Sequence, residues 1–424
     1  MTLDASAPRY MSRFRCIAER CEDTCCTGLT IPVSADRYGP LVDALGRNRA
    51  TAGLVQLVVR DESGEARIPV KSDSCCPFLD KERLCAVQRH SGEAVLPDVC
   101  VFFPRFLYRR GERLEVSASL ACPETARLCL LAEDAMEPVP VPLDVAKRPE
   151  LARTAALEDA YERYEEQVRA TALALLGRRE YPLGSRLLFL GQLALRLEDF
   201  YFRGTTAFEG AAREEAEARL SAELAAFGDE ALLDALHARF SALELPPGMC
   251  AGLFGSVLRT RVRSSPGARF ERLAGAALAS MEAGAESAEP DAVGLAYVQR
   301  RNRLDAADPA RVARYFRNFC QNHFVREPFT GARSLLPYVF TLAMRAGLLR
   351  FVLAGHPVVE TLGPGEDAAS AEAGERLDAA AVETFQLVAK HVERKADFVE
   401  LIRTLSGASE AETFGKVLVF ARFC

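Results

Sequence analysis

Four cysteine side chains lie within eleven residues near the start of the chain, and thiols this close together could hold a metal. They are Cys16, Cys21, Cys25 and Cys26. A second series follows at Cys75, Cys76, Cys85, Cys100, Cys122 and Cys129. Ten of the thirteen cysteines therefore precede residue 130. This concentration indicates that the N-terminal third needs sulfur for a local chemistry.

The N-terminus and the apolar runs indicate a reducing compartment. The first ten residues lack the apolar core of a secretory signal, and no uninterrupted apolar run approaches the length of a membrane span. We therefore predict a cytoplasmic protein with no membrane partner, in which clustered cysteines bind metal more often than they form disulfides. A disulfide framework is the less favoured alternative. The net charge of −6 gives no reason to expect nucleic-acid binding.

The spacing of the thiols suits an iron–sulfur cluster at least as well as structural zinc, which stays the alternative. Zinc sites usually show paired Cys-x-x-Cys knuckles, and these are absent from the sequence. Adjacent side chains tend to diverge, so Cys25 and Cys26 are not expected to bind the same metal atom. One of them packs, or two centres share the segment. A radical-generating Cys-x3-Cys-x2-Cys motif fails because Gly28 stands at its third position.

Other candidate ligands have simpler interpretations. His90 is the histidine closest in sequence to the thiols, and ligation by it is the less favoured interpretation. His323 lies on an apolar helical face and is predicted to be a hydrogen-bonded core histidine. The remaining cysteines have no thiol neighbours in the sequence and are predicted to pack as small apolar side chains. They are Cys250, Cys320 and Cys424.

The thiols must be positioned by an irregular N-terminal part with short hairpins. One hairpin is predicted from Leu54–Val59 and Ala66–Val70, and another from Phe106–Arg109 and Leu114–Ser119. Four prolines between residues 133 and 149 indicate an extended connector. We predict a cysteine-rich metal-cluster domain over residues 1–135, a connector over 136–149 and a helical domain over 150–424.

The predicted helical domain makes the fold class mainly α, with a small irregular α+β domain before it. Asp308-Pro309 is a strong helix start, with Asp at the N-cap and Pro at the first helical position. Residues 283–290 and 363–374 are predicted to be surface loops. The other long helices are predicted at Glu150–Leu176, Leu187–Phe202, Ala211–Ala226, Glu230–Leu243, Leu335–Leu353 and Val382–Leu405.

The thiol pattern resembles a known family. Cys16-x4-Cys21-Glu-Asp-Thr-Cys25-Cys26-x-Gly28 is similar to the opening of the flagellin lysine-N-methylase family. Further similar segments are Cys76-Pro-Phe-Leu79, Leu84-Cys85, Leu96-Pro97-Asp98-x-Cys100, Phe103-Pro104-Arg105 and Ser119-Leu120-x-Cys122-Pro123-Glu124. The pattern also resembles the broader class of zinc- or iron-chelating cysteine-cluster proteins. Leu29 stands where family members commonly have Trp, and Cys75 is an addition.

The resemblance implies transfer of a methyl group from S-adenosylmethionine to the ε-amine of lysines on flagellin. It also implies an iron–sulfur cluster of the 4Fe-4S type as a cofactor beside S-adenosylmethionine. The thiols that match the family pattern, and so are the expected metal ligands, are Cys16, Cys21, Cys25, Cys26, Cys76, Cys85, Cys100 and Cys122. Two alternatives stay open, a non-catalytic metal-binding accessory protein and an iron–sulfur redox protein.

Methyl transfer to lysine requires residue types that the sequence contains, although it does not show which of them form the site. The amine must be neutral and in line with the sulfonium, in a site that excludes water. A carboxylate or a tyrosine near the amine would help to hold it, and Glu124, Asp98 and Tyr108 are candidates near the thiols. The sequence identifies neither the catalytic residues nor the S-adenosylmethionine pocket. The cluster is expected to be structural, because two-electron methyl transfer needs no electron relay.

Overall fold

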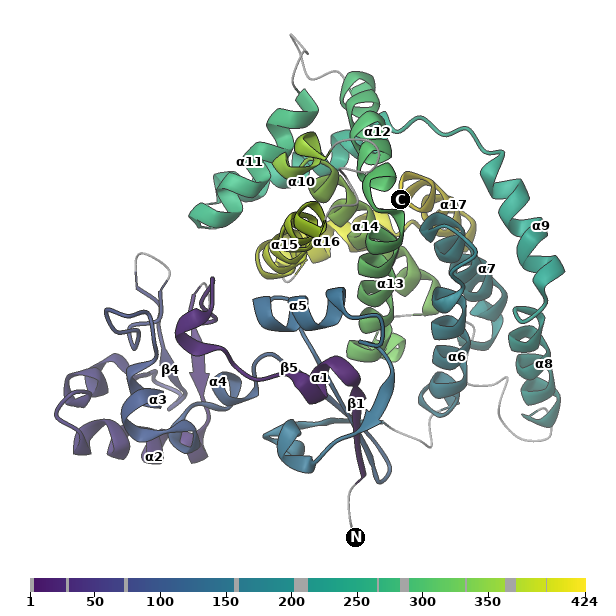
Figure 1. The fold of residues 1–424 in the computed structure, drawn as a ribbon. Helices are drawn as coiled ribbons and strands as arrows, with labels where there is room; N and C mark the ends of the chain where they lie inside the picture. The colour runs from purple at the N-terminus through teal and green to yellow at the C-terminus, as the bar shows by residue number, and fades with distance from the viewer. Residues whose placement is uncertain are drawn as a thin grey trace. The chain divides into compact units, whose positions relative to one another are not determined.

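The structure of the protein, a computed structural model, falls into two units. One is Met1–Leu128 with Glu137–Thr154, and the other is Cys129–Met136 with Ala155–Cys424. The first contains strands and short helices, and the second is helical (Figure 1). The predicted domain limits at residues 135 and 149 stay a prediction. The residues described are 4–27, 30–71, 75–155, 160–201, 213–264, 267–282, 290–331, 334–362, 371–393 and 395–424.

A five-stranded sheet forms part of the first unit, in the order β7-β1-β6-β5-β8. Its strands are β1 (Asp4–Pro8), β5 (Arg105–Arg110), β6 (Arg113–Ala118), β7 (Pro138–Pro140) and β8 (Arg153–Thr154). Strands β5 and β6 form the predicted second hairpin, with Arg110 paired to Arg113 and Gly111 at a φ of 59° in the turn. Strand β1 runs parallel to β6, so the first residues of the chain complete this sheet.

The proline-rich segment predicted as a connector belongs to the same sheet. Strand β7 pairs with β1 in antiparallel register, with Pro140 opposite Ser6. Proline cannot donate to a ladder and is therefore confined to edge strands, which is the position that β7 occupies. The Nε of Arg105 donates to the carbonyl oxygen of Val145 at 2.5 Å, which ties the following 3₁₀ turn (Leu143–Ala146) to β5.

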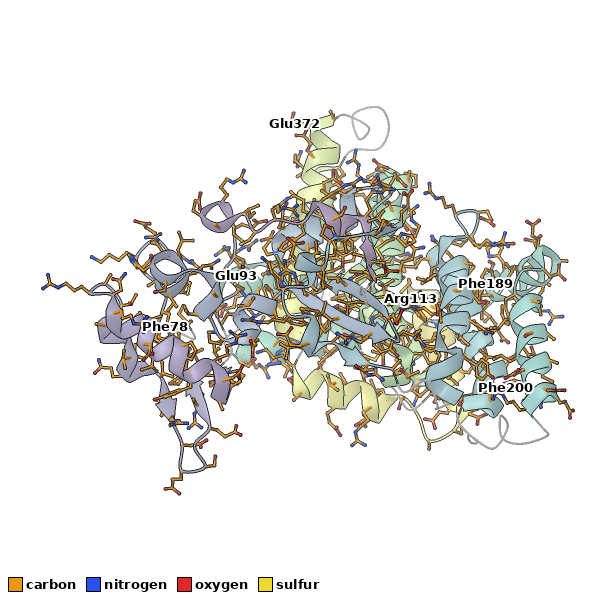
Figure 2. The ribbon with its side chains drawn as sticks, turned by 90° about the horizontal axis from the view of Figure 1, so that it is seen from below. Phe78, Glu93, Arg113, Phe189, Phe200 and Glu372 are labelled. Carbon is orange, nitrogen blue, oxygen red and sulfur yellow. The ribbon has the colours of Figure 1, made fainter. Side chains whose placement is uncertain are left out.

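A second small sheet, in the order β2-β4-β3, shares an apolar core with Cys26, Cys76 and Cys85. Its strands are β2 (Ile31–Val33), β3 (Val59–Arg60) and β4 (Ala66–Ile68). The helices of this part of the chain are α2 (Ala35–Arg47), α3 (Ala86–Ser91) and α4 (Asp98–Phe102). The first predicted hairpin exists but is shorter, because Ala52–Leu57 forms a 3₁₀ helix. The Asp61 side chain accepts from the amides of Ser63 and Glu65 in its turn. Phe78 belongs to the apolar core beside this sheet (Figure 2).

The second unit consists of helices, so the mainly α prediction is confirmed for the chain. They are α6 (Ala160–Gly177), α7 (Leu183–Tyr201), α8 (Arg213–Ala226), α9 (Glu230–Ser241), α10 (Gly248–Arg263), α11 (Ala268–Glu282), α12 (Pro290–Ala307), α13 (Pro309–Arg326), α14 (Leu335–Ala354), α15 (Ala371–Val388), α16 (Ala396–Leu405) and α17 (Glu410–Phe423). Asp308 caps α13 as predicted, because its carboxylate accepts from the amide of Arg311 at 2.9 Å.

Helix α14 is the centre of the helical unit. Helices α7, α12, α15 and α17 pack against it, and an apolar surface on all sides is typical of such a buried helix. By length and composition alone α14 could cross a membrane, but 89% of its most apolar window is buried inside the protein. Phe189 of α7 is one of the fully buried side chains of this unit (Figure 2).

Two predicted helices are wrong in part. The helix predicted over Glu150–Leu176 starts only at Ala160, because Arg153–Thr154 joins the first sheet as β8. The helix predicted over Val382–Leu405 is interrupted by a π-helical turn, η10 (Ala389–Glu393), before α16. Of the predicted loops, residues 283–289 and 363–370 lie outside the described residues, whereas Pro290 starts α12 and residues 371–374 belong to α15.

Helices α10 and α12 approach each other closely at two glycines. A Cβ at the buried Gly294 would lie 2.6 Å from the backbone nitrogen of Gly248. We therefore expect Gly294→Ala to lower the free energy of unfolding by ~1–3 kcal/mol, because the two backbones must separate. Gly275→Ala in α11 is the matched control, since nothing lies within 4 Å of its Cβ. There the better helix propensity should raise stability by ~0.5–1 kcal/mol. Urea unfolding measures both, and equal effects would contradict the close packing.

Candidate functional site

Five of the expected metal ligands form a first thiol group beside the second sheet. The amide of Cys76 donates to the carbonyl oxygen of Cys26 at 2.8 Å, and an isolated β-bridge pairs Leu79 with Cys85. Cys26 and Cys85 pack against the apolar core that includes Cys76. Helix α4 contributes Cys100, and Cys25 precedes Cys26 in the loop. The first thiol group is Cys25, Cys26, Cys76, Cys85 and Cys100.

The thiols of this group act on one another electrostatically. Burial raises the pKa of Cys100, and the nearby Cys85, Cys76 and Cys25 raise it further. A hydrogen bond with Cys25 raises the pKa of Cys26, and burial adds to this rise. Burial also raises the pKa of Cys76 and of Cys85, so these two thiols, Cys26 and Cys100 are protonated at neutral pH when no cation is close. A metal binds the thiolate form, so metal binding by this group would release protons.

A second thiol group consists of Cys16, Cys21 and Cys122. Burial raises the pKa of Cys122 to about 12, and the nearby Cys21 adds to the rise. Burial also raises the pKa of Cys21, to which Cys16 contributes. The guanidinium of Arg127 joins the segments after Cys21 and Cys122, because it donates to Glu22 at 2.5 Å and to Glu124. The predicted ligands therefore form two groups rather than one.

The donor atoms of these groups suit a soft metal, but the side chains are not arranged around one point. Among the residues that the structure describes, no three His, Cys, Asp or Glu side chains are placed to hold a metal ion. All thirteen cysteines are free thiols, which removes support from the disulfide alternative. His90 is exposed at the end of α3. Cys75, the additional thiol, forms an isolated β-bridge with Thr27.

The three side chains considered for holding an amine already have structural roles. Asp98 accepts from the Nε of Arg37 at 3.0 Å, where it fixes the start of α4. Glu124 pairs with Arg127 between the two segments of the second thiol group. Tyr108 is buried in β5, with 4% of its surface exposed. These contacts give each side chain a structural role, and a role in holding the amine stays a prediction.

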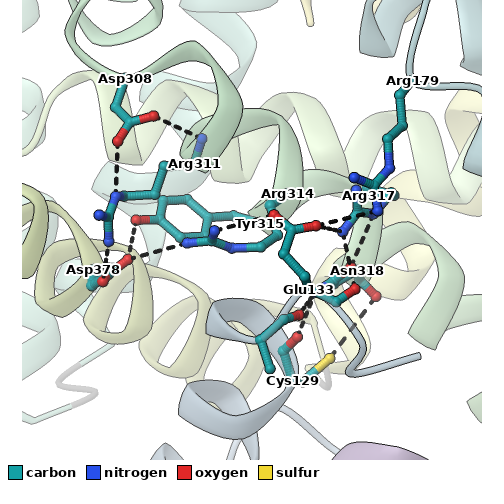
Figure 3. Close-up of polar contacts among 11 residues, drawn as sticks. Cys129, Glu133, Arg179, Asp308, Arg311, Arg314, Tyr315, Arg317, Asn318 and Asp378 are labelled. Carbon is teal, nitrogen blue, oxygen red and sulfur yellow. Dashed lines mark hydrogen bonds and ion pairs between the residues drawn. The ribbon is translucent and has the colours of Figure 1, made fainter. Parts of the chain in front are cut away.

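A second polar centre lies in the helical unit and is built around Glu133 (Figure 3). Its carboxylate pairs with Arg317 at 2.9 Å, with Arg314 at 3.2 Å and with Arg179 at 3.3 Å. The Asn318 amide donates to the carbonyl oxygen of Cys129 at 2.8 Å. These bonds attach residues 129–136 to helix α13. Cys129 is fully buried there, and burial raises the pKa of its thiol.

The Glu133 centre gives a pH-dependent contribution to stability. Burial raises the pKa of Glu133, but hydrogen bonds from Arg317 and Arg314 outweigh burial and lower it overall. Glu133→Gln should cost about 1 kcal/mol at neutral pH, a small value because 53% of the carboxylate side chain is exposed and screened. Because folding lowers this pKa, the ionised carboxylate stabilises the folded protein fully at pH values above the unfolded pKa of about 4.5. The difference in stability between the two proteins should therefore shrink as the pH falls below that value towards the lowered pKa of the folded protein.

The measurement is urea unfolding of both proteins between pH 3 and pH 7. Glu223→Gln is the control, because its pair with Arg196 joins two partly exposed side chains at 3.3 Å and should contribute less than about 0.5 kcal/mol. A difference for Glu133→Gln that is constant across this pH range would contradict the assigned role.

A pocket of about 550 Å³ opens elsewhere in the helical unit, and no predicted ligand lines it. Its wall contains Arg301 and Arg422, which donate to the carbonyl oxygens of Phe423 and Leu243. Cys250 also lines it and is 2% exposed, as predicted for a packing cysteine. Cys320 is fully buried, whereas Cys424 is partly exposed. The volume falls in the range of small-molecule sites.

The sequence analysis did not identify the residues whose contacts join segments far apart in the sequence. Arg127 had a local signal, because Glu124 precedes it by one helical turn and pairs with it. Glu393 and Arg345 had none, since their contact depends on the π-helical turn and on the packing of α14. His323 is buried and hydrogen-bonded as predicted, and its partner is Arg345.

Comparisons with known proteins give one matching family and several similar relatives. Residues 169–420 match the family described as the FliB lysine N-methylase C-terminal domain. The chain is 32% identical over 138 residues to the flagellar biosynthetic protein FliU of Salmonella muenchen, which is 81% of that protein. It is also 32% and 31% identical over 138 residues to the lysine-N-methylases of Salmonella typhimurium and Salmonella choleraesuis. These alignments cover 32% of this chain and 34% of each lysine-N-methylase. No solved structure matches.

Proposed function

The chain belongs to the family of the FliB lysine N-methylase C-terminal domain, and from this we propose that it is a protein-lysine N-methyltransferase with S-adenosylmethionine as its methyl donor. The family match over residues 169–420 carries the proposal, and two relatives named lysine-N-methylase support it. Flagellin is the proposed substrate, because a further relative is named a flagellar biosynthetic protein. The proposed location is the cytoplasm.

The proposed reaction is a direct displacement. The neutral lysine amine attacks the methyl carbon of the sulfonium, a C–N bond forms, and the S–C bond breaks with its electrons going to sulfur. The amine then loses a proton to a base or to water. The protein must orient the two reactants and exclude water from between them. No electron is transferred in this step.

The proposed metal cofactor is an iron–sulfur cluster, with zinc as the alternative. Eight of the thiols in the first unit supply donors of the right chemistry, and a backbone hydrogen bond from Cys76 to Cys26 joins two distant segments. The first thiol group has enough sulfur atoms for four ligands, and the second would bind independently or complete the centre. When bound, a cluster would stabilise the fold of these segments.

Methyl transfer is tested with purified protein, flagellin and radiolabelled S-adenosylmethionine. We expect label on lysine side chains of flagellin and equimolar S-adenosylhomocysteine. Flagellin whose lysines have been reductively dimethylated beforehand is the control, because a tertiary amine should accept little label. Absence of label on untreated flagellin, with S-adenosylmethionine still bound, would favour the accessory-protein alternative.

The metal is tested by iron, zinc and sulfide content of anaerobically purified protein. We expect about four irons and four sulfides per chain, and their loss in Cys76→Ser/Cys85→Ser. Cys250→Ser is the control, since that thiol packs in the helical unit. Zinc without sulfide would indicate a structural zinc site in place of the cluster. Protein that contains neither iron nor zinc would refute this part of the proposal. Reversible reduction without methyl transfer would favour the redox alternative.

A further inference from the structure

Helices α10 and α12 carry their most exposed apolar side chains at neighbouring points of the surface. Leu295 of α12 is 64% exposed and Met249 of α10 is 63% exposed, the two highest values for large apolar side chains among the described residues. Their neighbours in the sequence, Gly294 and Gly248, are in close contact, because a Cβ on Gly294 would lie 2.6 Å from the backbone nitrogen of Gly248. The two exposed side chains therefore start from adjacent backbone positions.

The pocket of about 550 Å³ described above borders these two side chains. Val298 lines the pocket and follows Leu295 on α12 by three residues, a spacing that places both on one side of the helix. Pro247 and Cys250, which flank Met249 in the sequence, line the pocket as well. An apolar surface thus continues from the pocket onto the exposed ends of α10 and α12.

The chain between α9 and α10 adds further apolar residues to the pocket. Leu243 lines it and is 39% exposed, and Leu245 and Pro246 line it too. Exposed apolar side chains that occur singly need no explanation, whereas a group of them beside a hollow marks an interaction site. We call the pocket, together with Leu243, Met249 and Leu295 at its edge, the α12 groove.

Two guanidinium groups give the α12 groove an excess of positive charge. Arg301 donates through Nη1 to the carbonyl oxygen of Phe423 at 3.3 Å, and Arg422 donates through Nε to that of Leu243 at 3.0 Å. Neither arginine forms an ion pair with a carboxylate among the residues that the structure describes. Glu244 lines the same pocket and offsets one of the two charges. A guanidinium has five N–H donors, so both arginines can donate to a bound acceptor.

We propose that the α12 groove docks the protein substrate through a segment that carries an Asp or Glu beside an apolar side chain. The carboxylate of this segment would accept from Arg422, and Arg301 would add to the positive potential around it. The apolar side chain would pack on Met249 and Leu295. The inference rests on the proposed function and adds to it a site that selects the protein substrate.

The charge of the α12 groove suits a carboxylate better than it suits the reacting groups of methyl transfer. The ammonium form of lysine and the sulfonium of the methyl donor are both cations, and the two guanidiniums of the pocket repel cations. Binding energy from parts of a substrate that do not react can still serve the reaction, because it holds the substrate on the enzyme. The groove therefore fits a role in docking.

The first test measures the KM and kcat of methylation with flagellin as the substrate. Leu295→Asp should raise KM about tenfold, because it places a charge where an apolar side chain packs. Arg422→Glu should also raise KM about tenfold, because it repels the carboxylate of the segment. The kcat at saturating flagellin should stay within about twofold, since a docking contact is made equally in the ground state and the transition state.

Two matched controls lie outside the α12 groove and should keep the KM of the wild-type protein. Val399→Asp changes an apolar side chain of α16 that is 50% exposed. Arg303→Glu reverses an exposed charge on α12, two residues after Arg301 and hence on another side of the helix. An S-adenosylhomocysteine affinity equal to that of the wild-type protein shows that each variant is folded. If Arg422→Glu does not fold, Leu295→Asp decides the matter, because its side chain is exposed.

The second test identifies the docked segment and its carboxylate. A photoreactive p-benzoylphenylalanine at position 249 should cross-link to one segment of flagellin, and Leu295→Asp should abolish the cross-link. Replacing the acidic residue of that segment by Lys should raise KM for the wild-type enzyme. Arg422→Glu should then restore KM towards the original value, because the two charges have exchanged places. A structural role of Arg422 alone would give no such restoration.

Four results would overturn the inference, and one of them also overturns the proposed function. Methylation with an unchanged KM in both groove variants would mean that the substrate does not dock there. A loss of S-adenosylhomocysteine affinity in both variants would assign the groove to the methyl donor. A dimer that Leu295→Asp dissociates, seen by light scattering and without a change in KM, would assign it to a second copy of the chain. A wild-type protein that does not methylate flagellin would refute the proposed function as well.

Discussion

Burying helix α14 on all of its sides constrains the whole helical unit. An apolar helix in such a position needs neighbours in every direction, and α7, α12, α15 and α17 provide them. Two arginines in this helix then become costly, because a guanidinium away from water must be paired. Arg350 pairs with Asp305 of α12, whereas Arg345 lies close to His323, Glu327 and Glu393. The polar chemistry of this unit is thus a consequence of how its core is built.

Local sequence signals correctly predicted the elements whose ends depend on one or two neighbouring residues. Asp308 caps α13, and Gly111 turns the second hairpin, since both depend on one or two residues. The 3₁₀ helix Ala52–Leu57 was missed because a short apolar run does not distinguish a strand from a helix. The position of β7 at a sheet edge was missed because pairing with β1 depends on residues at the other end of the unit.

The candidate site shows the same division between local and distant information. Residue type and clustering identified the thiols, and their number near the N-terminus predicted a metal centre. Their separation into two groups depends on pairings such as Cys26 with Cys76 and the Arg127 bond to Glu22, which span 50 to 105 positions. Glu393 carried no sequence signal at all, because a π-helical turn depends on what surrounds the helix.

The Glu133 centre has a consequence for the order in which the chain can fold. Residues 129–136 belong to the helical unit, yet the chain returns to the first unit for residues 137–154. The Glu133 carboxylate and Arg317 are 184 positions apart. At a synthesis rate of about 5–20 residues per second, the segment waits roughly 10–40 s for its partner helix. During translation these residues therefore stay without their partner helix for that time, and an isolated C-terminal fragment would lack the carboxylate with which Arg314 and Arg317 pair.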